Sequence, residues 1–499
     1  MNNLQKNKIQ EELDSLSKKE QKSLKKVTFD QELVDNNIIL SVRHLKKYFT
    51  LGKGRNKVKL KAVHDVSFDI KKGEVFGIVG ESGCGKSTTG RTLIRLHAPT
   101  SGSVYFNGYR IAAGNRWNQK EIKWTNVRGK NKIKELKEQC DAEIAQFVKK
   151  TTPDQTTINQ IKNKYKIQID NIKLHIKETE RVQKEKIKQH NYDNKHVDKH
   201  LLTKMQMIFQ DPIDSLDPRM TVYDIIAEGL KIQNFAKIQR DKVTRKYHKL
   251  IQEETDSNKK EELKVKCEEE IKNLPSYKDM VASILNKVGL IPDYANRYPH
   301  EFSGGQRQRI GIARALIMQP DLIIADEPIS GLDVSIRAQI INLLNDLRKE
   351  FGLTIIFIAH DLSVVKYFSD RIAVMYYGNL VELASADELF KHPLHPYTKA
   401  LLSAIPKPDP LFEKTRQRIH YDPSQHDYST DKPSFQEVSP KHFVLCNSKE
   451  FDAYKKEIIE EDKKAKENKK VTRKTSTKKT VKKTTRKTTS RKNQTKKTA

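Results

Sequence analysis

Apolar residues recur at two periods along this chain, and the two periods predict two kinds of element. In the segment 58–70 apolar and polar residues alternate, which is typical of β-strands. The apolar positions there are Val58, Leu60, Ala62, Val66, Phe68 and Ile70. A short apolar run, expected for a strand buried on both faces of a parallel sheet, occupies 75–79, and similar sheet-like stretches occupy 205–209, 322–325 and 354–358. Segments with helical spacing separate these runs, so the pattern predicts an α/β fold.

The segment 113–203 has a different character. Its apolar residues recur three or four positions apart, from 133 to 148 and again from 158 to 176, which is helical spacing. The sequence Thr151-Thr152-Pro153-Asp154 separates the two stretches as a capped, proline-started helix would. We therefore predict an antiparallel helical hairpin as an insertion in the domain, and a second charged helical insert over 234–274.

Composition limits the class of protein. The chain has 499 residues, of which 36% are hydrophobic and 32% charged. It can therefore bury a large core, but the high fraction of charged residues indicates that part of its length lies outside that core. No apolar run of membrane-spanning length occurs, and the start lacks the apolar stretch of a secretory signal peptide. The four cysteines form no CxxC pair, which fits a reducing compartment. We expect a cytoplasmic protein.

The net charge of +31 is concentrated in two places. Residues 471–499 contain twelve Lys or Arg and no acid, and residues 111–200 contain 21 basic and 12 acidic side chains. We predict that 451–499 is a disordered basic tail, because it lacks apolar surface to offset ordering entropy. Anionic lipid headgroups, nucleic acid phosphates or solvent alone are the alternatives for its surroundings. Residues 1–36 are predicted to form a frayed helix or a polar arm.

The first chemical motif is the sequence Gly80-Glu81-Ser82-Gly83-Cys84-Gly85-Lys86-Ser87. It fits the P-loop pattern, follows the apolar run 75–79 and precedes a plausible helix. Its backbone N–H groups would surround phosphate, Lys86 would reach the terminal phosphates, and the Ser87 hydroxyl would bind Mg²⁺. The phosphate-binding residues are predicted to be Gly80, Ser82, Gly83, Cys84, Gly85, Lys86, Ser87 and Thr88. A structural glycine turn is the alternative.

Cys84 stands inside this loop, beside a predicted helix N-terminus, where a thiol's pKa is expected to be lowered. Phosphate binding has no use for a thiol, so we expect Cys84 to be tolerated there and reactive.

The apolar run 322–325 ends in two adjacent carboxylates, Asp326 and Glu327. Ligands of open α/β sheets bind at this end of the strands. Asp326 is suited to hold Mg²⁺, and Glu327 to accept a proton from an attacking water. The alternative is an acidic turn that ends a strand, which the P-loop elsewhere in the chain disfavours.

A second anion site is predicted at Ser303-Gly304-Gly305-Gln306, which precedes a helical segment over 310–318. Ser303 can cap this helix, and the glycines expose N–H groups. A helix cap alone would account for the serine, but not for a second phosphate cradle more than two hundred residues after the first.

Together, these motifs and His360 after an apolar run resemble the nucleotide-binding subunit of an ABC transporter. The resemblance covers about 37–112, 204–233 and 275–450, and the stretches 205–230, 298–316 and 392–406 resemble the oligopeptide/dipeptide importers. It implies an α/β P-loop NTPase cassette over 37–450, with a RecA-like core, an antiparallel β subdomain and a helical subdomain over 223–316. It also implies a C-terminal extension over 386–450.

The resemblance also implies roles for four more residues. Tyr48 matches the aromatic residue that stacks on adenine, although Phe49 is its neighbour and Tyr48 is alternatively core. Gln210 matches a glutamine that contacts Mg²⁺ and the attacking water, and Asp333 matches the D-loop aspartate. His360 matches the histidine that holds the γ-phosphate, with capping of the next helix as the alternative. The catalytic set is thus Glu327, His360 and Gln210, and the metal set is Ser87, Gln210 and Asp326.

In this family two cassettes sandwich ATP and Mg²⁺ head to tail. Lys86 would serve this subunit's ATP, whereas Ser303, Gly304, Gly305 and Gln306 would serve the partner's. The resemblance implies a heterodimer with a related ATPase, two membrane permeases and an extracellular peptide-binding protein. It places the chain peripherally, on the cytoplasmic face of the cell membrane, as a hydrolysis-competent motor for oligopeptide import.

The alternative is a soluble ABC ATPase that acts on nucleic acid or ribosomes, which the positive charge and the hairpin would suit. Against it, the chain has one P-loop and one SGGQ sequence, its main insert precedes Gln210, and it has no CxxC pair. A third possibility, an interaction protein with an inactive cassette, is disfavoured because Lys86 and Glu327 are both present. Nucleic acid is therefore not the expected partner.

Overall fold

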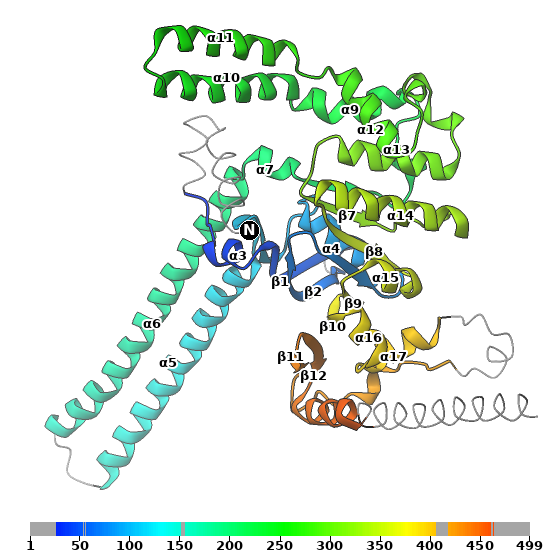
Figure 1. Ribbon diagram of the computed structural model, residues 1–499. Coiled ribbons are helices and arrows are strands. Elements are labelled where there is room, and N and C mark those ends of the chain that lie inside the picture. The colour runs from blue at the N-terminus through cyan, green and yellow to red at the C-terminus, as the bar shows by residue number, and fades with distance from the viewer. Residues whose placement is uncertain are drawn as a thin grey trace, which may run out of the picture. The chain divides into compact units, whose positions relative to one another are not determined.

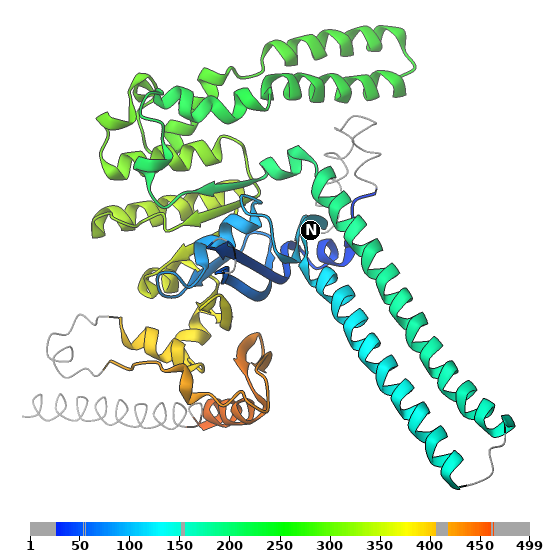
Figure 2. The ribbon, with the colours of Figure 1, turned by 180° about the vertical axis from the view of Figure 1, so that it is seen from behind.

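The computed structural model describes residues 26–52, 54, 56–150, 155–405, 418–460 and 463 (Figures 1 and 2). By its internal contacts the chain divides into two compact units. The first comprises the described residues up to Asp370 together with Met375–Leu380, and the second comprises Arg371–Val374 and the described residues from Val381 onward.

A parallel sheet lies at the centre of the first unit. Its strands lie in the order β3 (Val75–Val79), β8 (Thr354–Ala359), β7 (Leu322–Asp326) and β6 (Met205–Ile208). Every residue of β3, β7 and β8 is buried, as their unbroken apolar runs predicted. Helices α4 (Lys86–Leu93), α14 (Val334–Phe351) and α15 (Leu362–Phe368) follow β3, β7 and β8 in the chain. The predicted α/β fold is confirmed.

A separate antiparallel sheet has the order β2 (Val58–Lys71), β1 (Ile38–Leu51), β4 (Ser101–Phe106) and β5 (Tyr109–Asn115). The alternation in β2 predicts its inward residues only in the second half, where Val66, Phe68 and Ile70 are buried. Val58 and Leu60 are 65% and 52% exposed. Pairing of β1 with β4 ends at Lys46, so these two residues lie on a two-stranded ribbon that no third strand supports.

The prediction of a polar arm over residues 1–36 is wrong for its last part. Residues 31–35 form α3 (Gln31–Asp35), which buries Leu33 and Val34. Val27 is also buried, and Phe29 forms a bridge with Tyr109 of β5. A few apolar residues are therefore enough to pack this otherwise polar segment against the rest of the first unit. Residues 1–25 lie outside the described part of the chain.

The inserts form two pairs of helices, as their spacing predicted. Helices α5 (Arg116–Lys150) and α6 (Gln155–His196) lie side by side in both views (Figures 1 and 2). Gly129 permits their close approach, since a Cβ atom there would lie 2.3 Å from Cδ1 of Ile176. Helix α7 (Lys199–Thr203) leads to β6. The second pair is α10 (Phe235–Glu253) and α11 (Ser257–Lys272).

The remaining elements between β6 and β7 are helical, and those after α8 lie in the range 223–316 or begin one residue before it, where a helical subdomain was predicted. They are α8 (Pro212–Ser215), α9 (Val222–Ile232), α12 (Tyr277–Lys287), η1 (Pro292–Asn296), η2 (Pro299–Glu301) and α13 (Gly304–Leu316). Within the described ranges, no helix is both long and apolar enough to cross a membrane.

The second unit contains β11 (Ser434–Ser439), β12 (His442–Cys446) and most of β10 (Asn379–Ser385) and of β9 (Arg371–Tyr376), in that order. Helices α16 (Ala386–Lys391) and α17 (Pro396–Ser403) and the short η3 (Pro423–Gln425) complete it. Its core contains Leu394, Val438, Val444, Cys446 and Tyr454.

Tyr454 belongs to a helical segment over residues 448–460. A disordered tail from residue 451 was therefore the wrong prediction for 451–460, because Tyr454 and the partly buried Phe451 and Ile458 supply apolar surface. The predicted disorder of 464–499 falls outside the described residues.

Candidate functional site

The P-loop joins β3 to α4 through glycines that no other residue can replace without a clash. Gly80 and Gly85 have φ angles of 150° and 106°. A Cβ atom would lie 2.2 Å from the Met375 carbonyl oxygen at Gly80, and 2.1 Å from that of Ala62 at Gly85. Lys86 Nζ donates to the carbonyl oxygens of Gly80 at 2.8 Å and Glu81 at 2.9 Å. The loop therefore curls around the ammonium group, which places a positive charge where a phosphate would lie.

Cys84 contradicts the expectation of a reactive thiol. Burial raises the pKa of its thiol, and this effect outweighs the nearby Lys86 ammonium, which lowers it. Lys86 Nζ lies 3.9 Å from Cys84 Sγ. The side chain is only 5% exposed, so a thiolate there would be shielded from water, although Lys86 would stabilise its negative charge. The prediction of a lowered pKa is wrong for that reason.

Ser87 and Asp326 meet although 239 residues separate them. Ser87 Oγ donates a 2.7 Å hydrogen bond to Asp326 Oδ1. Asp326 is fully buried, and burial raises the pKa of its carboxyl, while Ser87 and Arg91 lower it. Its Oδ2 has no hydrogen bond in the described part of the chain, and Arg91 Nη2 lies 3.8 Å away. A buried carboxylate oxygen of this kind calls for a cation or a bound water.

A hydroxyl and a carboxylate are oxygen ligands of the kind that Mg²⁺ prefers. Among the described residues, no group of three or more His, Cys, Asp and Glu side chains has an arrangement that could hold a metal ion. Mg²⁺ is usually held by one or two carboxylates plus substrate phosphates and waters. Ser87 and Asp326 therefore fit a magnesium ion that arrives with a nucleotide.

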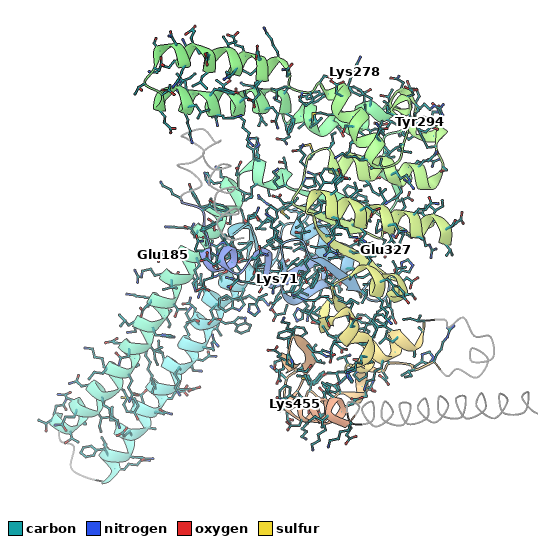
Figure 3. All side chains as sticks on the ribbon, in the orientation of Figure 1. Lys71, Glu185, Lys278, Tyr294, Glu327 and Lys455 are labelled. Atoms are coloured by element: carbon teal, nitrogen blue, oxygen red, sulfur yellow. The ribbon has the colours of Figure 1, made fainter. Side chains whose placement is uncertain are left out.

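Glu327 joins three segments of the chain. Glu327, which is labelled in Figure 3, lies directly after β7, and its φ of 46° is unusual for a residue with a side chain. Gln210, after β6, donates from Nε2 to Glu327 Oε2 at 3.2 Å. His360, after β8, has Nδ1 3.2 Å from the same oxygen. The carboxyl ends of three adjacent parallel strands thus bring the three predicted catalytic residues together.

The SGGQ segment begins helix α13, as predicted. Ser303 Oγ accepts from the Gln306 backbone N–H at 3.4 Å, and Gln306 Oε1 accepts from the Ser303 N–H at 3.0 Å. This reciprocal cap fixes the helix N-terminus. Both of these hydrogen bonds lie within the cap itself.

Gly304 instead lines a cleft of about 810 Å³. The cleft is also lined by residues that follow β6 in the chain, Gln210 and Asp211, and by residues that follow β7, Ser330, Gly331 and Leu332. Asp333 precedes α14 as its N-cap residue, but its side chain accepts no capping hydrogen bond.

Strand β2 lies between Tyr48 and the P-loop. Tyr48 pairs with Lys61, whose neighbour Ala62 lies against Gly85. The Tyr48 hydroxyl is 2.5 Å from His64 Nδ1, and burial raises the pKa of the phenol. The Arg116 guanidinium lies 5.8 Å from the centre of the ring.

Phe49, the alternative aromatic residue, points its ring at His97, with a centroid distance of 5.4 Å. Sequence reasoning missed His64, Arg116 and Arg91 as neighbours of the site. Only for Arg91 was there a signal, since it lies four residues after Ser87 and so on the same face of α4.

Comparison with known proteins identifies the class of protein to which this fold and site belong. The chain matches the family model described as "ABC transporter" over residues 63–171 and 156–330. It also matches "Oligopeptide/dipeptide transporter, C-terminal region" over 381–435. The chain therefore belongs to the ABC transporter family, as the sequence motifs predicted.

Two curated relatives are similar over most of the chain. It is 45% identical over 417 residues to the oligopeptide transport ATP-binding protein OppF of Bacillus subtilis, covering 83% of this chain and 98% of that protein. It is 40% identical over 403 residues to the oligopeptide transport ATP-binding protein AmiF of Streptococcus pneumoniae, covering 81% and 94%. Among solved structures, the ADP form of the MJ1267 cassette is 18% identical over 74% of this chain and 99% of that one, with a TM-score of 0.41.

Proposed function

We propose that this chain is the subunit of an ABC importer that binds and hydrolyses ATP to drive oligopeptide uptake. The observation that carries the proposal is the meeting of Gln210, Glu327 and His360 beside the Ser87–Asp326 pair. A set of this kind, next to a P-loop, provides phosphate binding, metal binding and a proton acceptor at one sheet edge. The peptide cargo rests on the likeness to OppF and AmiF.

Each side chain has a role that its contacts support. The P-loop N–H groups and Lys86 bind the β- and γ-phosphates, and Ser87 and Asp326 hold magnesium with help from Gln210. Magnesium, when bound, neutralises charge on the phosphates. In the described part of the chain, Gln210 and His360 both contact Oε2 of Glu327. We assign Oε1 to the attacking water, whose proton Glu327 accepts, while His360 also reaches the γ-phosphate.

The SGGQ segment completes the proposal with a partner. Ser303, Gly304, Gly305 and Gln306 would bind the nucleotide held by a related ATPase, whose own SGGQ segment would close over Lys86 of this chain. We propose such a heterodimer, bound to two membrane permeases that an extracellular peptide-binding protein supplies. The chain then lies peripherally on the cytoplasmic face of the cell membrane, with Asp333 at the contact between the two ATPases and Tyr48 against adenine.

The chemical part is tested by substituting Glu327 with Gln. Removing a general base lowers turnover by about a hundredfold or more, whereas ATP binding should persist because the phosphate-binding groups are unchanged. Lys86→Ala should weaken ATP binding as well as turnover. Glu185, labelled in Figure 3, is an exposed residue of α6, and Glu185→Gln serves as the matched control. Hydrolysis by Glu327→Gln at the wild-type rate would show that Glu327 is not the base.

The transport part is tested by reconstitution. The complex of this chain with its permeases and partner ATPase, in sealed vesicles, should accumulate peptide only with ATP and Mg²⁺, and the Glu327→Gln complex should not. The alternative, an ATPase acting on nucleic acid or ribosomes, predicts co-sedimentation with ribosomes that resists moderate salt. Peptide uptake without such binding excludes this alternative.

A further inference from the structure

Both tryptophans of the chain lie on one exposed face of α5. Trp117 and Trp124 are seven residues apart, so their side chains point in directions only about 20° apart around the helix. Each is 52% exposed, and Val127, 37% exposed, extends the face. The opposite face of α5 packs on α6, where Leu136 is buried and Gly129 faces Ile176. The aromatic face is therefore the one that α6 does not cover.

The same stretch of α5 is strongly basic. From Arg116 to Lys134 it contains seven basic residues and one acid, Glu121. Glu121 is already paired with Arg128 at 3.0 Å. Lys120 and Lys123 flank the tryptophans, are exposed, and have no ion pair within the described ranges. Two large amphipathic rings thus stand beside two lysines that no ion pair in the described chain neutralises, whereas Arg128, Lys132 and Lys134 are paired with Glu121, Glu135 and Glu138.

We propose that the face formed by Trp117, Lys120, Lys123, Trp124 and Val127 docks on the anionic headgroups of a lipid membrane. Tryptophan favours the boundary between headgroups and acyl chains, because its ring is apolar and its N–H is polar. Lysines beside it gain from the negative surface potential, and a helix with this pattern lies in the plane of the interface. The inference rests on the membrane location in the proposed function.

A flat partner suits this face better than a nucleic acid strand does. Bases that stack on aromatic side chains are held in positively charged grooves, whereas these rings stand on the convex surface of a helix. Nucleic acid binding is nevertheless a distinct outcome of the test below.

Hydrogen bonds connect the base of the hairpin to strands β4 and β5 of the first unit. The Trp117 backbone N–H donates to Ser101 Oγ of β4 at 3.0 Å. On α6, the Asn194 side chain donates to and accepts from the backbone of Ala113, both at 2.9 Å. The residue before Trp117 is Arg116, whose guanidinium lies over Tyr48. The docked face is thus continuous with the aromatic residue proposed to bind adenine.

Tryptophan fluorescence of the unmodified full chain tests the proposal, because the only two tryptophans both lie on this face. Vesicles of phosphatidylglycerol in phosphatidylcholine should shift the emission to shorter wavelength, and vesicles of phosphatidylcholine alone should not. Sedimentation with vesicles is not diagnostic by itself, since the basic residues 471–499 also attract anionic lipid. The emission, in contrast, reports only what happens at positions 117 and 124.

The double variant Lys120→Glu/Lys123→Glu retains both reporters. It should need at least about tenfold more anionic lipid for the same shift. Lys162→Glu/Lys166→Glu on α6 makes the same charge change at two exposed lysines and should stay within about twofold of wild type. Equal losses in the two variants would mean attraction by net charge alone and would overturn the assignment to this face.

Three further results would overturn the proposal. One is sedimentation with vesicles without an emission shift, which means that another segment binds lipid. Another is blue emission before lipid is added, which means that the chain itself covers the tryptophans. The third is a shift with single-stranded RNA but not with vesicles. ATP hydrolysis is measured on the same samples, so a normal rate together with any of these results would leave the proposed function standing.

Discussion

At the scale of single residues, the surroundings of Tyr48 give a testable view of nucleotide binding. Thr100 holds two segments at once: its Oγ1 accepts from the Tyr48 N–H at 3.0 Å, and its carbonyl accepts from the Arg116 N–H at 3.1 Å. The guanidinium of Arg116 is thereby kept over the Tyr48 ring. A cation at this position stabilises the ring's orientation, and the ring is proposed to stack on adenine.

We predict that Arg116→Ala weakens ATP binding about two- to fivefold, the loss expected from one partly exposed cation–π contact. The Kd of tripolyphosphate should not change, because the P-loop is untouched. Isothermal titration with both ligands measures this, and Arg128→Ala, farther along α5, is the control. Equal weakening of both ligands would contradict an effect on the base.

The sequence identified which residues form the site, but it did not predict their burial or their contacts. The spacing of the P-loop, the strand before Asp326 and the order of the motifs led to Lys86, Asp326, Glu327 and His360. A motif, however, gives residue type and not burial. Cys84 was expected to have a lowered pKa, but packing against the loop raises it. The Ser87–Asp326 hydrogen bond and the contacts of Arg116 depend on segments that meet only in the fold.

At the scale of elements, one buried ion pair ties the helical hairpin to the rest of the first unit. Asp193 of α6 is fully buried, and Arg110 of β5 donates from Nε to its Oδ2 at 2.7 Å, while the Nη2 atom of the same guanidinium lies 2.6 Å from that oxygen as an ion pair. Its Oδ1 accepts from the Thr28 backbone N–H at 3.2 Å and from Gln189 at 2.8 Å. A single carboxylate therefore joins the N-terminal segment, the antiparallel sheet and the hairpin.

We predict that Asp193→Asn destabilises this region by roughly 3 kcal/mol, because it leaves the Arg110 guanidinium buried without its counter-charge. Urea unfolding measures the loss. Asp170→Asn, an exposed residue of α6 paired only with Lys173, is the control and should cost less than about 0.5 kcal/mol. The double variant Arg110→Met/Asp193→Leu should recover much of the stability. If Asp193→Asn alone unfolds like wild type, the hairpin is held by other contacts.

Periodicity predicted the elements well where they face a continuous core, and poorly at their ends. The parallel strands and both helical pairs follow from apolar spacing. Val58 and Leu60 alternate like inward residues, yet they lie on an unsupported ribbon, because the extent of β4 is not encoded in β2. Residues 26–36 and 451–460 were assigned to tails because each has few apolar residues. Val27, Leu33, Val34 and Tyr454 are nevertheless buried, whereas Phe29 and Ile459 are exposed. Composition averaged over a segment does not reveal which of its apolar residues are buried.

At the scale of the whole molecule, the second unit buries a group of ionisable side chains in addition to its apolar core. Glu382 and His442 are fully buried, with Glu382 Oε1 2.8 Å from His442 Nε2. His395 is buried and stacks on His426, with centroids 5.3 Å apart. Its Nδ1 accepts from the Tyr397 backbone N–H at 3.1 Å and so caps α17.

Burial, followed by repulsion from His426 and Lys399, lowers the pKa of His395 from 6.5 to about 3. The folded chain therefore keeps this ring neutral at a pH where the unfolded chain protonates it. Between pH 6.5 and 3 the unfolded state binds the extra proton, so the stability of the second unit falls as the pH falls through this range. For this one residue the loss from pH 7 to pH 5 amounts to about 2 kcal/mol.

We predict that the second unit opens before the first on mild acidification, and that His395→Asn removes most of this difference. Asparagine can still cap α17 but does not titrate. Hydrogen exchange of peptides from α17 and β12, corrected for the intrinsic pH dependence of exchange, measures the opening free energy at pH 7 and pH 5. His44→Asn, at an exposed histidine of the first unit, should leave the pH dependence unchanged.

His395 lies in the stretch 392–406 that resembled the peptide importers, yet the sequence alone did not reveal its burial, because His426 and Tyr421 reach it from farther along the chain. If the opening free energy of α17 in the wild type is the same at both pH values, His395 is protonated in the folded state without cost, and the acid sensitivity assigned to the second unit is wrong.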